Sequence, residues 1–511
     1  MEKSFDGRLG DLVESLAVIG WEALFNESER RQSSKVSRHV VMKKIFISVG
    51  LVAAGATGLQ SACAAGLDVI SPKAWNVSAT LRGFYDDNYA ISSAKKGSFG
   101  VELSPQISFN VPLQQTDLGM RYIYGLYYYQ QRQDLGVNAF DQTHQFDLWL
   151  DHSFNERWRV KLTDTLAIGQ EPALLQPNQG AGAAIPYRIE GDNLANHALI
   201  TLNTDWTRLF STAIHYGNNY YDYDNSGASL MSPQPLFPPF GTQFGMPVST
   251  PGVSGFNSLN APGASYAGLL NRIEQSAGID FQWHLQQETM LFVGYNFSLV
   301  NYTGDEPIAV FNYVDNYVDQ SPASRSVVYR SDSRDSMTHY GYVGVQHDFT
   351  SNLSGMARGG VSYTDSYNDP LQNSTSLAPY ADLNISYTYI PGSYVQLGFT
   401  HDINSTDVAT VGSNGSLTQY QESSVVYADI NHRFTPKLLG TAVARYQYST
   451  FEGGASTGGG DSSYGFGLNV NYAINPHFYA DAGYNYDNMK SDLGGRGYER
   501  NRVYIGLGAN Y

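Results

Sequence analysis

Residues 502–511 read RVYIGLGANY, and they end the chain on a strict alternation of apolar residues with polar or small ones. In an extended strand successive side chains point to opposite faces, so every second residue shares a face. The apolar face of this stretch carries Val503, Ile505, Leu507, Ala509 and Tyr511. Residues 463–472, SYGFGLNVNY, alternate in the same way. A period of two with one apolar face predicts β-strands.

The same alternation extends outward through most of the chain after residue 75, and no stretch after residue 66 shows the period of a helix. We predict about eighteen strands, with sixteen as the alternative count. The predicted strands are 75–85, 98–111, 117–130, 142–154, 158–170, 194–204, 208–221, 272–285, 288–302, 336–349, 353–366, 377–390, 393–404, 422–434, 438–451, 462–474, 478–488 and 501–511.

The connections between these strands alternate between short and long. Every second one is a tight turn, such as FNER (154–157), FTSN (349–352) and FTPK (434–437). The others are long, and the largest are residues 171–193, 222–271 and 303–335. Short turns at one end and long loops at the other are typical of bacterial outer-membrane barrels. The pattern predicts an all-β, transmembrane, antiparallel up-and-down barrel with both termini periplasmic and the long loops extracellular.

A soluble propeller or sandwich array is the alternative fold class. Such repeats recur at a nearly fixed period, whereas hairpin spacing here varies with the long loops, so we favour the barrel. The composition agrees, because the 511 residues include 38 Tyr, 24 Phe and 51 Gly and only 15% are charged. The mean hydropathy of −0.31 fits a wall in which only alternate residues face lipid. A net charge of −16 argues against a nucleic-acid partner, which requires a basic footprint.

Residues 42–65 have the pattern of a secretory signal peptide. Two lysines follow Met42, residues 45–59 are apolar, and small residues lead to a predicted cleavage after Ala64 or Ala65. The apolar run is shorter than the roughly 20 residues of a membrane-spanning helix, which disfavours an anchor. We interpret residues 1–41 as a mis-called or extra N-terminal extension, with an unusually long basic region of the signal as the alternative. Residues 66–511 then form the barrel, exported through a Sec-type signal.

Cys63 is the only cysteine, and it lies at the exit of the predicted signal. Lipidation at Cys63 would need a different residue from Gln60 at the third position before it, so we disfavour a lipoprotein. Once the signal is removed, the chain has no thiol for a disulfide or a metal site.

Three near-copies of one motif end a predicted strand and begin a tight turn: LDHSFNERW (150–158), VQHDFTSNL (345–353) and DINHRFTPKL (429–438). Three histidines could bind a metal ion. In a closed barrel, however, His152, His347 and His432 would point outward from separate strands, so we predict no metal site. We expect Phe154, Phe349 and Phe434, together with Tyr511, to belong to an aromatic girdle at the periplasmic lipid interface.

With the signal peptide, the strand and turn pattern and the ending VYIGLGANY, the chain resembles Gram-negative outer-membrane porin-type proteins of the "putative β-barrel porin" families over about residues 66–511. The ending resembles the C-terminal signal by which the barrel assembly machinery recognises its substrates, with Tyr511 as the terminal aromatic residue. The resemblance implies residence in the outer membrane. Some similar barrels accompany exopolysaccharide secretion, so it leaves export open.

The three turn motifs set the register and therefore predict which residues face the lumen. The charged candidates for the pore lining are Arg82, Glu102, Arg121, Asp147, Arg159, Lys161, Asp280, Arg358, Asp382, Asp429, Arg445 and Asp481, with Asp151 and Asp348 as further members. Basic and acidic residues alternate between neighbouring strands. This alternation indicates either cross-strand ion pairs or an electrostatic filter, and we favour the pairs, with weak ion selectivity and at most a mild cation preference.

Two other features lead to more specific expectations. Strict alternation points Asp164 at lipid, so we expect a β-bulge there that redirects the strand. Residues 222–271 are too apolar for a free loop, and we expect them either to fold into the pore or to cap its mouth. Their start, DYDNSG (222–227), resembles a calcium loop, but Pro233 occupies the twelfth position, where such a loop needs Glu, so we interpret it as a turn.

We therefore predict a porin-like channel for passive diffusion of small hydrophilic solutes. The alternative is a non-conducting or export-associated barrel that serves exopolysaccharide secretion or surface structure. We predict no enzyme and no cofactor, because no HExxH or P-loop motif appears and the other histidines, His197, His215, His284 and His339, have no catalytic signature. Expected partners are outer-membrane lipid and lipopolysaccharide, the barrel assembly machinery and small solutes, and homo-oligomerisation is left open.

Overall fold

The computed structural model describes residues 74–134, 138–169, 193–223, 266–315 and 323–511. The first nine strands are β1 (Trp75–Asp86), β2 (Ser98–Pro112), β3 (Thr116–Tyr129), β4 (Phe140–Ser153), β5 (Trp158–Gly169), β6 (Asn193–Asp205), β7 (Phe210–Tyr223), β8 (Arg272–Gln286) and β9 (Thr289–Tyr302). The next two are β10 (Pro307–Asp315) and β11 (Ala323–Arg330). The remaining strands are β12 (Ser336–Thr350), β13 (Leu353–Ser366), β14 (Ser374–Ile390), β15 (Ser393–Asn404), β16 (Tyr420–Thr435), β17 (Leu438–Glu452), β18 (Gly460–Ala473), β19 (Phe478–Ser491) and β20 (Tyr498–Asn510).

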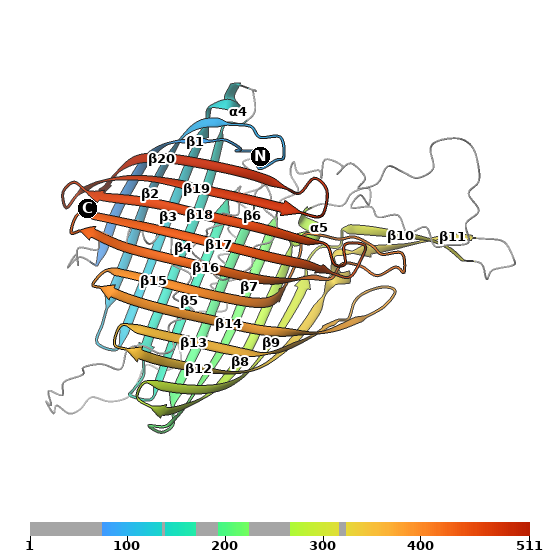
Figure 1. Cartoon of the computed structure of the whole chain (residues 1–511), viewed down its shortest axis with the longest axis horizontal. Helices are drawn as coiled ribbons and strands as arrows, with labels where there is room; N and C mark the ends of the chain where they lie inside the picture. The colour runs from blue at the N-terminus through green and yellow to red at the C-terminus, as the bar shows by residue number, and fades with distance from the viewer. Residues whose placement is uncertain (1–73, 135–137, 170–192, 224–265, 316–322) are drawn as a thin grey trace, which may run out of the picture. The chain divides into compact units, whose positions relative to one another are not determined.

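Eighteen of these strands form one closed antiparallel sheet (Figure 1). Each strand pairs with the next, β9 pairs with β12 across the intervening segment, and β20 pairs with β1 from Ser78↔Asn510 to Asp86↔Arg502. The predicted barrel of eighteen strands is confirmed, and the alternative of sixteen is wrong. Each of the eighteen barrel strands begins and ends within about three residues of its predicted range, because lipid on one side imposes a period of two that is visible in the sequence.

The short turns share a local device that explains the repeated motif. The residue after the strand-ending Phe is Thr or Asn, and its side chain accepts hydrogen bonds from backbone N–H groups two and three residues later. Thr435 accepts from Lys437 and Leu438, at 3.2 and 3.0 Å, and Asn155 accepts from Arg157 and Trp158, at 2.8 and 3.0 Å. These side chains replace the backbone bonds that a tight turn leaves open.

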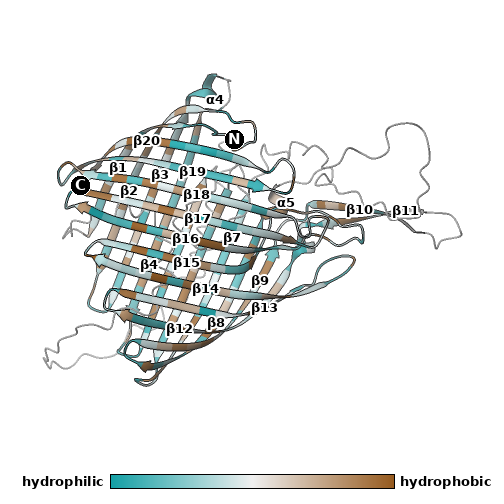
Figure 2. Cartoon of the chain, viewed as in Figure 1, coloured by the Kyte–Doolittle hydropathy of each residue, from teal (hydrophilic) through white to brown (hydrophobic). Residues whose placement is uncertain are grey.

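The two faces of the sheet differ in residue type along every strand, as the alternating colours of Figure 2 show. One face presents large exposed apolar side chains, for example Leu81, Val343 and Ile505. The other face is more buried and carries most of the charged residues. Because side chains diverge from a convex surface and converge inside a closed one, the exposed apolar face is the outer wall.

The bulge expected at Asp164 is absent, and that prediction is wrong. The pairing of β5 runs without a shift through Leu148↔Asp164 and Asp164↔Ala198. Asp164 stays on the outer face and accepts a hydrogen bond from the side-chain amide of Asn196, 2.7 Å away. Register shifts occur instead at the short-turn ends, such as Arg433/Thr435 in β16. A polar neighbour on the adjacent strand thus stabilises the outward carboxylate without any change of register.

The segment between β9 and β12 contains structure that the sequence did not predict. β10 and β11 pair as a hairpin of their own, which extends beyond the ends of the barrel strands in Figure 1. A 3-10 turn, η3 (Ser331–Arg334), follows directly, and the short helices α4 (Gln130–Asp134) and α5 (Tyr266–Leu270) lie in two other connections. β10 begins PIAVF, without period-two alternation, because Ile308, Ala309 and Phe311 are all buried. A search for strands with one lipid-facing side therefore misses it.

Several predictions fall outside the described residues. They are the extension 1–41, the signal peptide 42–65 with cleavage at Ala64 or Ala65, most of the loops 171–193 and 222–271, and the calcium-like stretch after Tyr223. In the part of the chain that is described, no helix is long and apolar enough to cross a membrane.

Candidate functional site: the inner wall and the mouth

All the charged residues predicted to line the pore share the inner face of the sheet, because the pairing is continuous and keeps faces in register from strand to strand. Three oppositely charged pairs of these residues stand directly opposite each other: Arg82↔Glu102, Arg121↔Asp147 and Arg358↔Asp382. Their closest nitrogen–oxygen distances are 3.0, 2.7 and 2.6 Å. The alternation of sign between strands therefore produces ion pairs along the wall.

Two further pairs do not join directly opposed residues. Arg159 binds Asp151 diagonally, with its Nε 2.6 Å from Oδ1, while Lys161 is the residue opposite Asp151. Arg82 also reaches Asp481 on β19, with its Nε 2.6 Å from Oδ2, although β20 lies between their strands. Such partly buried pairs hold neighbouring strands together more than they attract a solute.

Asp280, Asp429 and Arg445 bond to neutral side chains. The Tyr342 hydroxyl donates to Asp280 at 2.7 Å, the Tyr394 hydroxyl donates to Asp429 at 3.4 Å, and Arg445 donates to Gln447 at 2.9 Å. A tyrosine hydroxyl solvates a carboxylate but leaves its charge in place. These acids therefore contribute negative charge to the wall. Whether any of these residues lines a conducting pore stays a prediction.

A recurring arrangement on the inner wall is an aromatic ring laid over a glycine of the next strand. Tyr427 on β16 lies over Gly398 on β15 and bonds Asn384 on β14, with 2.9 Å between its hydroxyl and Nδ2. A Cβ built at Gly398 would stand 2.2 Å from the Tyr427 ring. Only glycine leaves room for the ring, so this arrangement ties three strands together.

The three motif histidines lie apart, on β4, β12 and β16, which are not neighbours in the sheet. Each ring contacts the Phe two residues later edge to face, and each Nδ1 meets a hydroxyl: Thr116 for His152, Thr289 for His347 and Tyr389 for His432. Among the described residues no group of His, Cys and acidic side chains could hold a metal ion. Phe154, Phe349, Phe434 and Tyr511 are exposed at the short-turn end, and their role as a girdle stays a prediction.

At the opposite end, segments between the strands pack into a small apolar core that the sequence did not reveal. It joins α5, the β10–β11 hairpin and the connection 405–419 between β15 and β16; its members include Leu270, Ile308, Tyr329, Val411 and Leu417. We call residues 405–419 the mouth segment. Its stretch from Thr406 to Val411 is at most 4% exposed. A surface loop with that burial is unusual, since loops normally carry solvated backbone.

Three consecutive residues fasten the mouth segment to three different places. The Ser405 hydroxyl lies 3.4 Å from Glu274 on β8, which four strands separate from β15 in the sheet. The carbonyl oxygen of Thr406 accepts a hydrogen bond from Arg334 of η3, at 2.7 Å. Asp407 accepts two bonds from Arg496, at 2.9 and 3.0 Å. The mouth segment therefore ties together strand ends and connections that are distant around the rim.

The two arginines that hold this segment differ in charge compensation. Arg334 is buried, its cation lies over the Tyr302 ring at 4.4 Å, and its side chain also donates to the Leu269 carbonyl. Burial lowers the pKa of Arg334. Burial would also lower the pKa of Arg496, but Asp407 and Asp461 outweigh it and raise that pKa above its ordinary value. Arg496 therefore holds the mouth segment through ion pairs in which the buried charges compensate each other, whereas Arg334 has no acidic partner in its contacts with the described residues of the segment.

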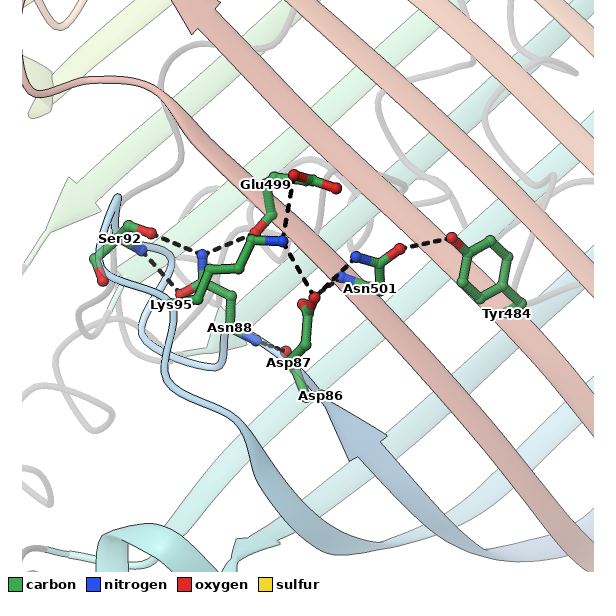
Figure 3. Close-up of polar contacts among 8 residues, drawn as sticks. All are labelled: Asp86, Asp87, Asn88, Ser92, Lys95, Tyr484, Glu499 and Asn501. Carbon is green, nitrogen blue, oxygen red and sulfur yellow. Dashed lines mark hydrogen bonds and ion pairs between the residues drawn. The ribbon is translucent and has the colours of Figure 1, made fainter.

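The seam between β1 and β20 ends in a polar cluster at the same rim (Figure 3). The Asp87 carboxylate accepts bonds from the backbone N–H and side-chain amide of Asn501, at 2.6 and 2.8 Å. Lys95 lies 3.4 Å from Asp87 and 3.2 Å from Glu499. The connection between β1 and β2 is thereby bound to the last strand of the barrel.

Sequence reasoning missed the mouth segment for a physical reason. Residues 405–419 read STDVATVGSNGSLTQ, which looks like an ordinary polar loop. The weak signal was the stretch VATV (408–411) before GSNGS and the pair Leu417 and Thr418 after it. These form a small hairpin, bridged at Val411↔Leu417, with Gly415 in the left-handed region at φ 82°. The hairpin is buried only because residues of distant connections, in α5 and the β10–β11 hairpin, pack against it.

A closed antiparallel barrel with an apolar exterior and a charged, hydrogen-bonded interior is the architecture of outer-membrane proteins. The chain folds as a closed β-barrel of this architecture. Residues 310–511 match the family model described as "Putative beta-barrel porin 2", so the resemblance to this type of family is confirmed over these residues. No curated protein matches the sequence.

Solved structures similar to this chain include an outer-membrane protein, a porin and an iron transporter. OpdK from Pseudomonas aeruginosa is 10% identical, with 86% of this chain and 99% of that chain covered and a TM-score of 0.38. A BenF-like porin from Pseudomonas fluorescens Pf-5 is 10% identical, with 86% and 99% covered and a TM-score of 0.39. The FrpB iron transporter from Neisseria meningitidis is 10% identical, with 84% and 64% covered and a TM-score of 0.36.

Proposed function

We propose that the protein is an outer-membrane channel through which small hydrophilic solutes diffuse passively. The supporting observation is a set of buried polar atoms on the inner wall that have no hydrogen-bond partner among the described residues. Asn471 is 2% exposed, yet neither its amide nitrogen nor its oxygen has such a partner. The same two atoms of the half-buried Asn203 also have none. Buried polar groups are almost always satisfied by protein or by water. A wall built in this way requires water beside it.

Reconstitution into planar bilayers tests the proposal. Folded protein should give stable, stepwise conductance that grows with salt concentration, because ions would move through an aqueous lumen. A shift in electrophoretic mobility between boiled and unboiled samples should confirm that the inserted protein is folded. Silence from folded, inserted barrels would contradict the channel.

The second candidate is a non-conducting barrel, either export-associated, for exopolysaccharide secretion, or structural at the cell surface. The fastening of the mouth segment to Glu274, Arg334 and Arg496 favours this candidate, because it places packed chain at the end where solutes would enter. The same bilayer measurement separates the two: a barrel of this kind stays silent, whereas a channel with a narrowed mouth still conducts in small steps.

The remaining assignments are part of the same proposal. It includes no enzymatic activity and no cofactor. The short-turn end, where β1 begins and β20 ends, is assigned to the periplasm, and contact with lipopolysaccharide to the opposite rim. The terminal strand that ends at Tyr511 is proposed to be read by the barrel assembly machinery. Trp75 and Tyr511, with ring centroids 5.7 Å apart, join the first and last strands at that end.

A further inference from the structure

The charges of the inner wall are matched on one arc of the barrel and unmatched on another. On the arc from β19 through β20 to β5, arginines and acids occur in pairs: Arg82 with Glu102 and Asp481, Arg121 with Asp147, Arg159 with Asp151, and Arg500 with Asp86. Paired charges largely cancel at the distance of a passing ion. This arc is therefore nearly neutral to a solute in the lumen.

On the arc from β8 to β16, which we call the acidic arc, carboxylates outnumber cations. Arg272 is paired with Glu274, Arg358 with Asp382, and Arg433 stands at the short-turn end of β16. Four inner-face acids have no cationic partner within 4.0 Å among the residues that the structure describes: Asp280, Asp348, Asp402 and Asp429. Three of them accept bonds from neutral donors: Asp280 from the hydroxyl of Tyr342, Asp429 from that of Tyr394, and Asp402 from the backbone N–H of Ile403.

A second observation on the acidic arc also points to a positively charged ligand. On the strands of this arc, the buried side-chain atoms without a hydrogen-bond partner among the described residues are oxygens: Asp348 Oδ1, Asn384 Oδ1 and Asn431 Oδ1. Asn384 is 6% exposed, and its side-chain nitrogen donates to the hydroxyl of Tyr427. Its side-chain oxygen has no donor among the described residues. Hydrogen-bond acceptors without donors, next to uncompensated carboxylates, favour metal cations and ammonium groups.

The four acids also lie at different depths. Asp402 is near the long-loop end of β15, Asp280 and Asp429 lie in the middle of β8 and β16, and Asp348 lies near the short-turn end of β12. Such spacing lets a cation pass from one carboxylate to the next without leaving favourable potential, which a single tight site would not allow.

We infer that the acidic arc makes this channel selective for cations, from K⁺ to small organic ammonium compounds. The inference rests on the proposed channel function and replaces the weak selectivity that the overall charge pattern predicts. Anions meet net negative charge along the acidic arc.

The test is the reversal potential of reconstituted channels in a KCl gradient. We expect the wild-type permeability ratio of K⁺ to Cl⁻ to be at least about 3, and the fourfold variant D280N/D348N/D402N/D429N to fall close to 1. The double variant R121Q/D147N removes one matched pair from the neutral arc, so its ratio should equal that of the wild type. If the fourfold variant does not fold, D280N/D429N and D348N/D402N divide the same change, and each should lower the ratio part of the way.

The possible failures are distinguishable. A conducting wild type with a ratio of 1 or below, or a fourfold variant that keeps the wild-type ratio, overturns the cation inference and leaves the channel intact. A folded wild type that never conducts overturns the channel itself, and the inference with it. A drop in R121Q/D147N as large as in the fourfold variant also overturns the role of the acidic arc.

Discussion

Arg82 binds Asp481 across an intervening strand, with its Nε 2.6 Å from Oδ2, and the residue beneath the contact is Gly506. The three residues belong to β1, β19 and β20, so the ion pair spans the seam where the first and last strands close the barrel. A Cβ at Gly506 would stand 2.6 Å from both Arg82 Cγ and Asp481 Oδ1, and 2.8 Å from the Leu81 carbonyl oxygen. Closure of this barrel therefore depends on a glycine in its final strand.

Gly506→Val should weaken the seam. The added side chain overlaps both ion-pair partners and backbone, and overpacking of this kind costs about 1–3 kcal/mol. Urea unfolding of the barrel in lipid vesicles, followed by electrophoretic mobility, measures the loss. Gly83→Val is the matched control, because a Cβ at Gly83 on the adjacent strand meets nothing within 4 Å. Equal losses in the two variants would refute the role of Gly506.

Tyr427→Phe should destabilise the wall by removing one hydroxyl. The ring still covers Gly398, but the amide of Asn384 loses its partner, and an unsatisfied buried polar group costs about 1–3 kcal/mol. The same urea titration provides the measurement. Tyr387→Phe serves as the control, since Tyr387 lies exposed on the outer wall. If Tyr427→Phe is as stable as the wild type, the bond from Tyr427 to Asn384 does not hold the strands.

Arg496→Gln should release the mouth segment. The change leaves Asp407 and Asp461 without the guanidinium that compensates them, and breaking a buried pair from one side is strongly unfavourable. Val408→Cys, at a site 1% exposed, provides a reporter in a background without Cys63. Maleimide labelling of this cysteine should accelerate at least about tenfold, equivalent to about 1.4 kcal/mol of opening free energy.

The control for this experiment is Arg330→Gln, which removes an exposed pair with Asp305 at the same rim. Labelling of the reporter should not change there, because exposed pairs contribute little. If both variants label at the wild-type rate, Arg496 does not fasten the mouth segment. This readout does not depend on conductance, so it stands whether the barrel is open or closed.

Asp87 at the seam should make stability fall in acid. Burial would raise the pKa of Asp87, but bonds from Asn501 and the charge of Lys95 lower it below the ordinary 3.8 (Figure 3). A carboxyl with a lowered folded-state pKa stabilises the fold above its unfolded pKa, and that contribution is lost as pH falls through the folded value. Asp87→Asn should therefore be less stable than the wild type at pH 7, and the difference should close in acid. A difference that stays constant with pH would contradict this.

Asp335, the residue before β12, should make stability depend on pH in the opposite direction. Burial raises the pKa of Asp335, although bonds from the Tyr302 backbone and the Asn368 amide oppose the shift. A raised folded-state pKa gives stability that is present below the unfolded value of 3.8 and is lost as pH rises through the folded value. Relative to the wild type, Asp335→Asn should gain stability as pH rises from about 3 to 7, measured by the same urea titration across that range. A loss over that range would exclude the assignment.

Much of the inner wall could be predicted because apolar and polar residues alternate along each strand of a membrane barrel, and this alternation assigns each residue to one face. The turn after His432 fixes one residue on the outer face, and alternation then assigns Asp429 and Arg445 to the inner face. The sign alternation of neighbouring strands predicted cross-strand ion pairs in general, and Arg121 with Asp147 is one of those that form. The diagonal pair of Arg159 with Asp151 and the reach of Arg82 over Gly506 did not, because they depend on side-chain length and on strand offset.

By itself, the sequence determined the closed barrel, its eighteen strands and the two faces of its wall, since solvent on one side and lipid on the other impose a period of two that any reader of the chain can follow. The tertiary structure alone decided where charge remains unpaired on the inner wall and where the chain crosses the rim. Those features arise from contacts between residues such as Asp407 and Arg496, distant in sequence, that meet only when the sheet has closed. The sequence pattern of the mouth segment does not predict such contacts, because the stabilising interaction depends on a residue that lies far away in the sequence.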